Sequence, residues 1–376
     1  MSKYELSLSK DYVPSWTVVD AVRELFQNAL DQQTTTEDNT MFFNYDEQSE
    51  TLYIGNKLSV LDVKTLLLGS STKRDDPNTI GQFGEGYKIA TLVLTRQNKK
   101  VTFFNYGAKE VWNPRFVKSR RYNGEEILTF FVDKKYPWTK VPDNNLTITI
   151  EGISPHDYEQ IVESNLHLQD VGRIIESKYG RILEEDRYRS KVFVNGLYVC
   201  SYADYTQGYD FKSEHIKIDR DRKLADSFQL KWLSSTMLSG VDSDKTIELI
   251  KQGVADVAYV SDAGSSLWGT SSNTYKSISN KTYRAFKDEH GENAIPVTNQ
   301  DEFSKVSSLG SYNAVFVNQT YSNTIKSSEE YTEPINESKN KQSTKSKFEG
   351  WLNNHKQNLT KRSIKKLQYI IDEVTD

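Results

Sequence analysis

Residues 15 to 32 constrain the fold more than any other stretch, because their apolar side chains recur at the spacing of an α-helix. These side chains are Val18, Ala21, Val22, Leu25, Phe26, Ala29 and Leu30. We predict a helix over 15–32, capped by Ser15, with one face buried. A second stripe, roughly 130° around the helix, holds Asp20, Glu24, Asn28 and Asp31. Such a stripe is usually a solvated face, but this one contains acids and an amide without a lysine.

A glycine-rich stretch follows some fifty residues later, with the sequence "GQFGEGYK" ahead of the apolar run "IATLVL". Glycines let the backbone approach a ligand closely, and the start of the helix that follows attracts anions. The alternative is a plain tight turn with a solvated Lys88. Glu24 and Asn28 lie one helical turn apart, about 6 Å. An amide oxygen suits Mg²⁺ together with phosphate oxygens, and a neighbouring carboxylate suits the activation of water.

Two of these stretches resemble motifs of one superfamily. "ELFQNALD" (24–31) matches the E-x-x-x-N-x-x-D box, and "GQFGEGYK" (81–88) the G-x-x-G-x-G box, of the GHKL superfamily, which includes gyrase B subunits, heat-shock chaperones, MutL proteins and histidine kinases. "LLLGSSTK" (66–73) resembles the segment that opens the ATP lid in MutL-like members. The resemblance covers about the first 155 residues and implies a two-layer ATP-binding sandwich.

The resemblance also implies roles for particular residues, with ATP and Mg²⁺ as the ligands. Glu24 corresponds to the general base and Asn28 to the magnesium ligand, in a box that Asp31 completes. The phosphate loop and lid hinge correspond to Gly81, Gly84 and Gly86. Lys73 and Lys88 are further candidates for phosphate contacts, and Thr147 in "NLTITI" for a contact beside the adenine.

The sequence departs from the superfamily at the adenine-reading box, usually D-x-G-x-G. Here the equivalent stretch is "YIGNKLSV", with Gly55 and Asn56 where the aspartate would be. Either Asn56, Asp62 or a water replaces that carboxylate, or base selectivity is relaxed, or binding has been lost. We expect weaker discrimination of ATP from GTP than in relatives, unless Asn56 or Asp62 has taken over the role.

We predict an α/β protein in which a two-layer sandwich (1–155) precedes a smaller transducer-like α/β domain (156–243) and a small α/β domain (244–326). A linker (327–347) and a C-terminal helix (348–376) follow. Asn195-Gly196 between two apolar runs predicts a type I′ hairpin. The segment "IDRDRKLAD" contains cations, one of which could reach the γ-phosphate and stabilise the charge of the transition state. The alternative is that these residues form a surface cluster in which acids and bases pair. The candidate cations are Arg220, Arg222 and Lys223.

Composition limits the partners. The net charge of −4 and pI near 5.9 argue against a generally basic surface. No apolar run approaches the roughly 20 residues of a membrane span, and the first residues lack a signal-peptide core, so we expect a cytoplasmic protein. The single cysteine, Cys200, excludes an intramolecular disulfide. Residues 339–366 hold nine Lys or Arg against one acid, which suits nucleic acid, an acidic partner or simply a solvated helix.

These patterns favour a Mg²⁺-dependent, ATP-hydrolysing conformational switch that forms a homodimer or acts on DNA or a protein partner. The alternative is a nucleotide-sensing scaffold without useful turnover, which Gly55 suggests. A histidine kinase fits less well, because those proteins place the ATP domain after a phospho-accepting helix. The order of segments also resembles rapid-lysis A (rIIA-like) phage proteins, which would place the chain in the host cytoplasm.

Overall fold

A computed structural model describes residues 1–35, 39–67, 86–134, 146–216, 226–265, 272–334, 344–356 and 359–373. The chain belongs to the mixed α/β class, as the sequence predicts. It divides into two compact units. The first comprises 1–202 and 207–225, and the second comprises 203–206 and 226–376. The predicted segment 156–243 is therefore shared between the units.

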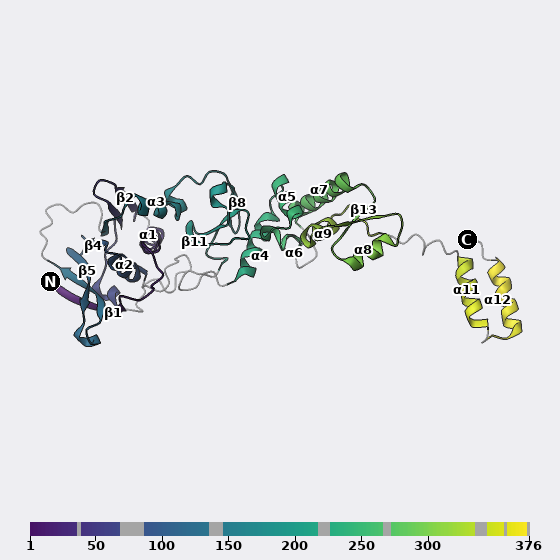
Figure 1. Ribbon diagram of the computed structural model, residues 1–376, viewed down its shortest axis with the longest axis horizontal. Coiled ribbons are helices and arrows are strands. Elements are labelled where there is room, and N and C mark those ends of the chain that lie inside the picture. Colours follow the sequence, from purple (N-terminus) through teal and green to yellow (C-terminus); the bar gives the residue numbers. More distant parts are fainter. Residues whose placement is uncertain are drawn as a thin grey trace. The chain divides into compact units, whose positions relative to one another are not determined.

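The first unit begins with a seven-stranded sheet in the order β1-β6-β5-β4-β7-β3-β2, in which every pair of neighbours is antiparallel. Figure 1 shows β1, β2, β4 and β5 in the part of the chain nearest the N-terminus. Its strands are β1 (Ser2–Ser9), β2 (Met41–Asp46), β3 (Thr51–Asn56), β4 (Lys100–Asn105), β5 (Glu110–Lys118), β6 (Glu126–Asp133) and β7 (Leu146–Glu151).

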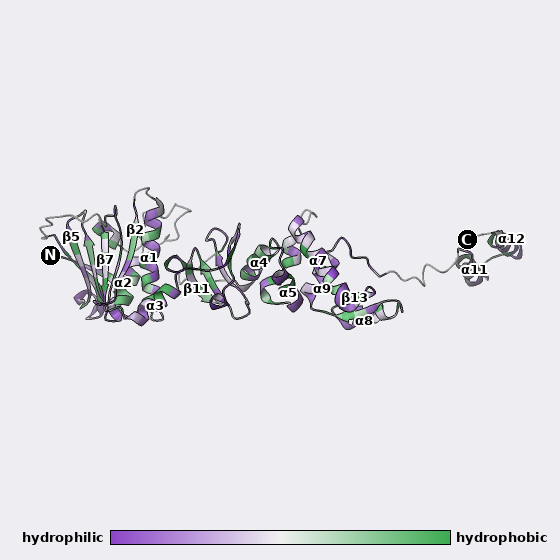
Figure 2. Cartoon of the chain, turned by 90° about the horizontal axis from the view of Figure 1, so that it is seen from above, coloured by the Kyte–Doolittle hydropathy of each residue, from purple (hydrophilic) through white to green (hydrophobic). Residues whose placement is uncertain are grey.

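Three helices cover one face of this sheet: α1 (Val18–Thr35), α2 (Gly86–Arg96) and α3 (Pro155–Glu163). Figure 2 shows them on the same side of the strands. The core between the layers includes Leu25 of α1, Leu92 of α2 and Ile54 of β3. Because side chains alternate along a strand, the residues next to Ile54 point to the other face.

The apolar face of α1 is buried as predicted, with Val18, Ala21, Val22, Leu25, Phe26 and Ala29 each at most 6% exposed. The predicted start is wrong by three residues. Thr17, not Ser15, caps the helix: its backbone nitrogen and hydroxyl donate to the Asp20 carboxylate, and its hydroxyl accepts from the Asp20 nitrogen. This reciprocal pair satisfies groups that the first turn leaves open.

Two strands, β1 and β5, were not predicted from the sequence. β1 alternates polar residues with only Leu6 and Leu8 buried. β5 contains Pro114, which ordinarily argues against a central strand. Pro114 is tolerated because β4 pairs only with Glu110 to Trp112 of β5, so among the described strands Pro114 has a neighbour on one side, β6.

The first unit continues into a five-stranded sheet in the order β11-β10-β12-β9-β8, in which only β10 and β12 run parallel. The strands are β8 (Ile174–Ser177), β9 (Gly180–Leu183), β10 (Lys191–Val194), β11 (Leu197–Ser201) and β12 (Gly208–Phe211). The predicted hairpin turn is confirmed: Asn195 and Gly196 join β10 to β11 with φ of 47° and 80°, the signs a type I′ turn requires.

The second unit is mainly helical. Its helices are α4 (Ser227–Leu238), α5 (Asp244–Gln252), α6 (Val260–Gly264), α7 (Asn273–His290), α8 (Gln300–Ser307), α9 (Gln319–Lys326), α11 (Thr344–His355) and α12 (Lys361–Glu373). A parallel pair, β13 (Ala294–Val297) and β14 (Asn313–Phe316), supplies its strands. The predicted single helix over 348–376 is wrong, because two helices occupy this region and the first begins inside the predicted linker.

None of the helices in the described ranges is both long enough and apolar enough to cross a membrane.

Gly55 is fixed by packing, which yields a first prediction. A Cβ at this position would lie 2.0 Å from the Leu146 carbonyl oxygen and 2.5 Å from the Phe42 ring. Because a backbone atom cannot give way as a side chain does, Gly55→Ala should lower the free energy of unfolding by about 1–3 kcal/mol. Gly350→Ala is the control for the added methyl group, since nothing lies within 4 Å of a Cβ there, and it should leave stability unchanged or raise it, because Gly350 lies inside α11. Thermal unfolding followed by circular dichroism checks both, and an unchanged Tm for Gly55→Ala would contradict this packing.

Candidate functional site

The polar stripe of α1 is not a solvated face, because Glu24 and Asp31 are buried, at 7% and 3% exposed, and Asp20 and Asn28 are half-buried. The adjacent Gln27 is 1% exposed. The Gln27 amide donates to the Asp31 carboxylate at 2.8 Å. Burying carboxylates and amides costs free energy that a purely structural helix would avoid. The stripe is therefore a candidate functional site as well as part of the packing of α1.

Gly86 lies directly against this stripe. It is the first residue of α2, and a Cβ added to it would sit 2.8 Å from Oε2 of Glu24 and 3.3 Å from Nδ2 of Asn28. The structure thus brings the third glycine of the sequence motif together with Asn28 and Glu24, which lie 58 and 62 residues earlier in the sequence. Any larger residue at 86 would press on the Glu24 carboxylate.

The Asn28 amide is oriented by its own helix. Nδ2 donates to the Glu24 backbone carbonyl at 2.8 Å. Within the described part of the chain its oxygen, Oδ1, accepts no hydrogen bond, so the oxygen is the atom offered to a ligand. A single amide oxygen beside a carboxylate suits a hard cation that keeps water or phosphate oxygens as its other ligands.

Lys88 is fully buried, which excludes the solvated lysine of the tight-turn alternative. Its ammonium donates to the Leu67 carbonyl at 2.6 Å, and the neighbouring Tyr87 hydroxyl lies 2.9 Å from that of Thr65. Burial raises the pKa of Tyr87 well above its usual value, so the phenol stays neutral. These two contacts join the start of α2 to the 3₁₀ turn at Val63–Leu66. Lys88 is thus engaged by a backbone carbonyl, whatever further contact it makes.

The residues predicted to contact the nucleotide base do not lie on one face of the sheet. Gly55 pairs with Thr147, and both alternate with residues of the helix-facing core, so they point away from α1. The structure does not bring Gly55 or Thr147 to the side of Glu24. Asn56 faces α1, is 3% exposed and donates from Nδ2 to the Ala29 carbonyl at 2.8 Å. Asp62 is exposed and accepts from the Lys64 nitrogen.

Six predicted site residues lie outside the described residues: Lys73, Gly81, Gly84, Arg220, Arg222 and Lys223. Among the residues that the structure does describe, no group of three or more His, Cys, Asp or Glu side chains could hold a metal ion. The metal candidate therefore remains Asn28.

The edge of α1 next to the stripe contacts the second sheet of the same unit. The Arg23 side chain is 7% exposed, donates to the Tyr198 carbonyl at 3.0 Å and pairs with Asp20 at 3.2 Å. Phe26 stacks on His167, with ring centroids 5.7 Å apart. The helix that carries Glu24 is thus attached both to its own sheet and to the β10–β11 hairpin region.

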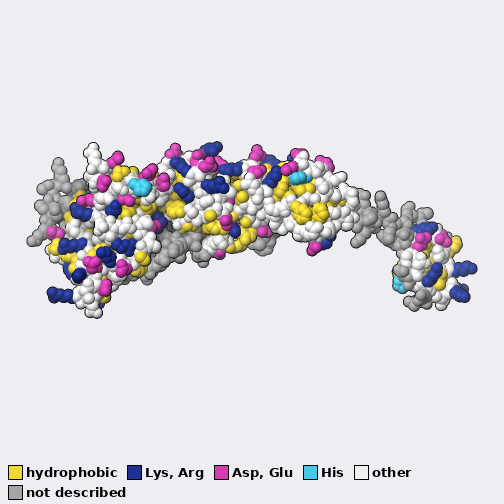
Figure 3. Space-filling view, in the orientation of Figure 1, with side chains coloured by type: hydrophobic (Ala, Val, Ile, Leu, Met, Phe, Trp, Pro, Cys, Tyr) yellow, Lys and Arg dark blue, Asp and Glu magenta, His cyan; other side chains and the backbone are white. Residues whose placement is uncertain are grey.

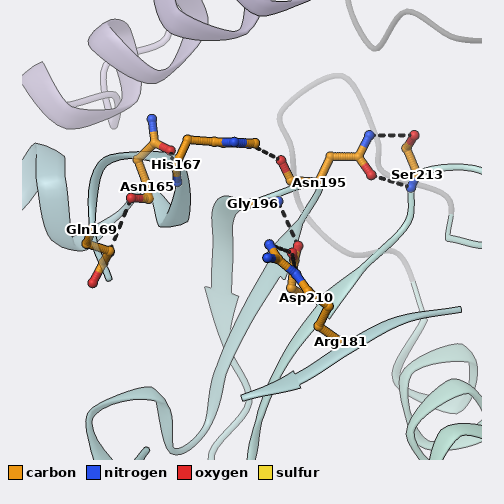
Figure 4. Close-up of polar contacts among 8 residues, drawn as sticks. All are labelled: Asn165, His167, Gln169, Arg181, Asn195, Gly196, Asp210 and Ser213. Carbon is orange, nitrogen blue, oxygen red and sulfur yellow. Dashed lines mark hydrogen bonds and ion pairs between the residues drawn. The ribbon is translucent and has the colours of Figure 1, made fainter. Parts of the chain in front are cut away.

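Around that hairpin lies a polar cluster that sequence reasoning missed (Figure 4). Asp210 is 5% exposed, and its carboxylate accepts from Arg181 at 2.5 and 3.0 Å and from the Gly196 nitrogen at 2.7 Å. The His167 ring lies 2.8 Å from the Asn195 carbonyl. Arg181 and Asp210 are 29 residues apart, and only the Asn-Gly turn gave a local signal.

The Asn195 side chain extends the cluster to the chain beyond β12. It donates to the Ser213 hydroxyl and accepts from the Ser213 nitrogen, each at 3.0 Å. Gly196 has no room for a side chain, because a Cβ would lie 2.5 Å from Nε2 of His167. These contacts connect the Asn195-Gly196 turn both to Ser213, after β12, and to His167, the ring on which Phe26 stacks.

Comparison with known proteins finds a family that matches the region containing the second sheet. Residues 156–238 match the family described as Mycoplasma pneumoniae MPN635 N-terminal domain. An uncharacterized protein of Mycoplasma pneumoniae (strain ATCC 29342 / M129 / Subtype 1) is 29% identical over 227 residues, which is 57% of this chain and 87% of that protein. The family match includes Arg181, Asn195, Gly196 and Asp210.

The buried Asp210 pair yields the second prediction. Asp210→Asn keeps the shape but removes the charge that holds Arg181 and the Gly196 nitrogen, so it should lower the free energy of unfolding by about 1.5–3 kcal/mol. Glu163→Gln, an exposed loss of a carboxylate in the same unit and away from Arg181, is the control and should shift stability by less than about 0.5 kcal/mol. Chemical denaturation measures both. Equal effects of the two changes would show that the Asp210 pair is not a structural centre.

Proposed function

We propose that the first unit binds a magnesium–purine nucleotide at the meeting point of α1 and α2 and hydrolyses it slowly, as a conformational switch. The proposal rests on one observation: Gly86 lies against the Glu24 carboxylate and the Asn28 amide. It is strengthened by the resemblance of 24–31 and 81–88 to the two GHKL boxes.

The residues present fit Mg²⁺ and phosphate. Oδ1 of Asn28 would hold the metal, and the backbone N–H groups at the start of α2 face an anion favourably. The absence of a side chain at Gly86 leaves the space beside Glu24 to a ligand. When bound, Mg²⁺ would neutralise charge on the phosphates and fix their orientation.

Glu24 would act as the general base. Its carboxylate is 7% exposed, so it can accept a proton from a water in surroundings where bulk water does not compete. The Asn28 side chain is tied to the Glu24 carbonyl, which keeps the metal ligand and the base at a fixed separation on one helix face. The attachment of α1 to the β10–β11 hairpin offers a route by which ligand binding would reach the second sheet.

Asn56 is the residue that we propose reads the base. Its Nδ2 is used by the Ala29 carbonyl, and in the described residues its Oδ1 accepts no hydrogen bond. An acceptor at this place favours a base with an amino donor, as adenine has, over guanine with its carbonyl oxygen. Asp62 is disfavoured for the role, because it is exposed and caps a 3₁₀ turn.

The proposed roles of Glu24 and Asn28 are separable by mutation. Glu24→Gln should leave Mg-ATP binding intact and slow phosphate release by about 10²- to 10⁴-fold, since the base acts only in the transition state. Asn28→Ala should weaken Mg-ATP binding by about tenfold or more. Calorimetric titration measures binding, and a phosphate-release assay measures turnover.

Glu159→Gln, an exposed change on α3, serves as the control for charge removal and should alter neither quantity. Phosphate release at the wild-type rate in Glu24→Gln would exclude this residue as the base. Tight binding by wild type without any phosphate release would instead identify a nucleotide-sensing scaffold.

Base selectivity gives a separate prediction. The wild-type chain should prefer ATP to GTP by about 5- to 150-fold, and Asn56→Ala should reduce that ratio towards one. The ratio of the two affinities is the quantity to compare, because loss of the contact between Asn56 and Ala29 would weaken the binding of ATP and GTP alike. Competition binding measures it, with Asp62→Ala as the control. An unchanged ratio in Asn56→Ala would remove this residue from the base pocket.

A further inference from the structure

The two C-terminal helices form a hairpin with a basic outer surface. α11 and α12 pack against each other and bury Leu352 and Ile371, each at most 3% exposed. Figure 3 shows Lys and Arg side chains beside hydrophobic ones on this part of the chain. Residues 344–373 hold seven Lys or Arg and three acids, although the whole chain carries a net charge of −4.

One stripe of α12 combines cations with exposed apolar groups. Arg362, Lys365, Lys366, Tyr369 and Ile370 recur at helical spacing and together line a shallow hollow of about 420 Å³. Tyr369 is 66% exposed and Ile370 57%. The Tyr369 ring is therefore open to a ligand, among the three cations of the same stripe.

The cations of the stripe are uncompensated. No ion pair formed within the described residues involves Arg362, Lys365 or Lys366. α11 adds Trp351, which is 49% exposed and stacks on His355 with ring centroids 4.6 Å apart. Within the described residues, the hairpin thus presents three cations outside any ion pair, together with the exposed ring of Tyr369.

We infer that this stripe binds single-stranded nucleic acid, with the three cations on phosphates and Tyr369 stacked on a base. Cations interleaved with aromatic rings are what a flexible single strand requires, since phosphates and unstacked bases alternate along it. A membrane surface fits less well. An interfacial helix inserts a continuous apolar face, whereas Ile371 is buried in the hairpin and the exposed Ile370 stands among the cations of the stripe.

The full-length chain should bind labelled single-stranded oligo-deoxythymidine in a fluorescence anisotropy titration, with affinity falling as salt rises from about 50 to about 200 mM. Lys365→Ala with Lys366→Ala should reduce the slope of log K against log salt by about 1.4, from two phosphate contacts at about 0.7 each. Tyr369→Ala should weaken binding about fivefold or more at every salt concentration and leave the slope unchanged.

The control is Lys118→Ala with Lys305→Ala, which removes the same charge from exposed positions outside the hairpin and should change neither value. All substituted side chains are exposed, so the variants should fold, which circular dichroism verifies. An equal loss in the control pair, no loss in Tyr369→Ala, or preferential binding to phosphatidylserine vesicles would each overturn the inference.

Discussion

The burial of α1 is the constraint on which the first unit depends. One face of the helix supplies Leu25 and its apolar neighbours to the core. Another holds Glu24 and Asn28 against Gly86, and the edge between carries Arg23 and Phe26 to the second sheet. A helix used on three sides cannot rotate without losing contacts on all of them. Its polar stripe is therefore held in register with the start of α2.

The register of β3 accounts for the departure of 53–60 from the D-x-G-x-G pattern with which the sequence was compared. A carboxylate at Gly55 would have no room beside the Leu146 carbonyl and the Phe42 ring, and it would point away from α1. Asn56 is one residue further on and faces the helix. The lack of an aspartate at position 55 therefore does not mean that the helix-facing side of β3 lacks a polar side chain. The question becomes whether an amide oxygen performs the recognition that the resemblance to GHKL proteins would assign to a carboxylate.

Sequence periodicity was enough to predict α1, its buried face and the Asn195-Gly196 turn, because each depends on neighbours in the chain. A resemblance to two sequence motifs, rather than periodicity, predicted that Glu24, Asn28 and Gly86 belong to one site. Periodicity failed for β5, where Pro114 is tolerated only because β4 stops short of it. Nor could it pair Arg181 with Asp210, or decide which of Gly55 and Asn56 faces the helix, since these depend on strand order and register.

The most direct test of the account is backbone hydrogen exchange of the full-length chain with and without Mg-ATP. A nucleotide held between α1 and α2 should slow exchange of the amides over residues 24–31 and 86–90, because both helices would open less often. The effect should weaken in Asn28→Ala. Unchanged exchange over both segments at millimolar Mg-ATP would contradict a nucleotide site at this place.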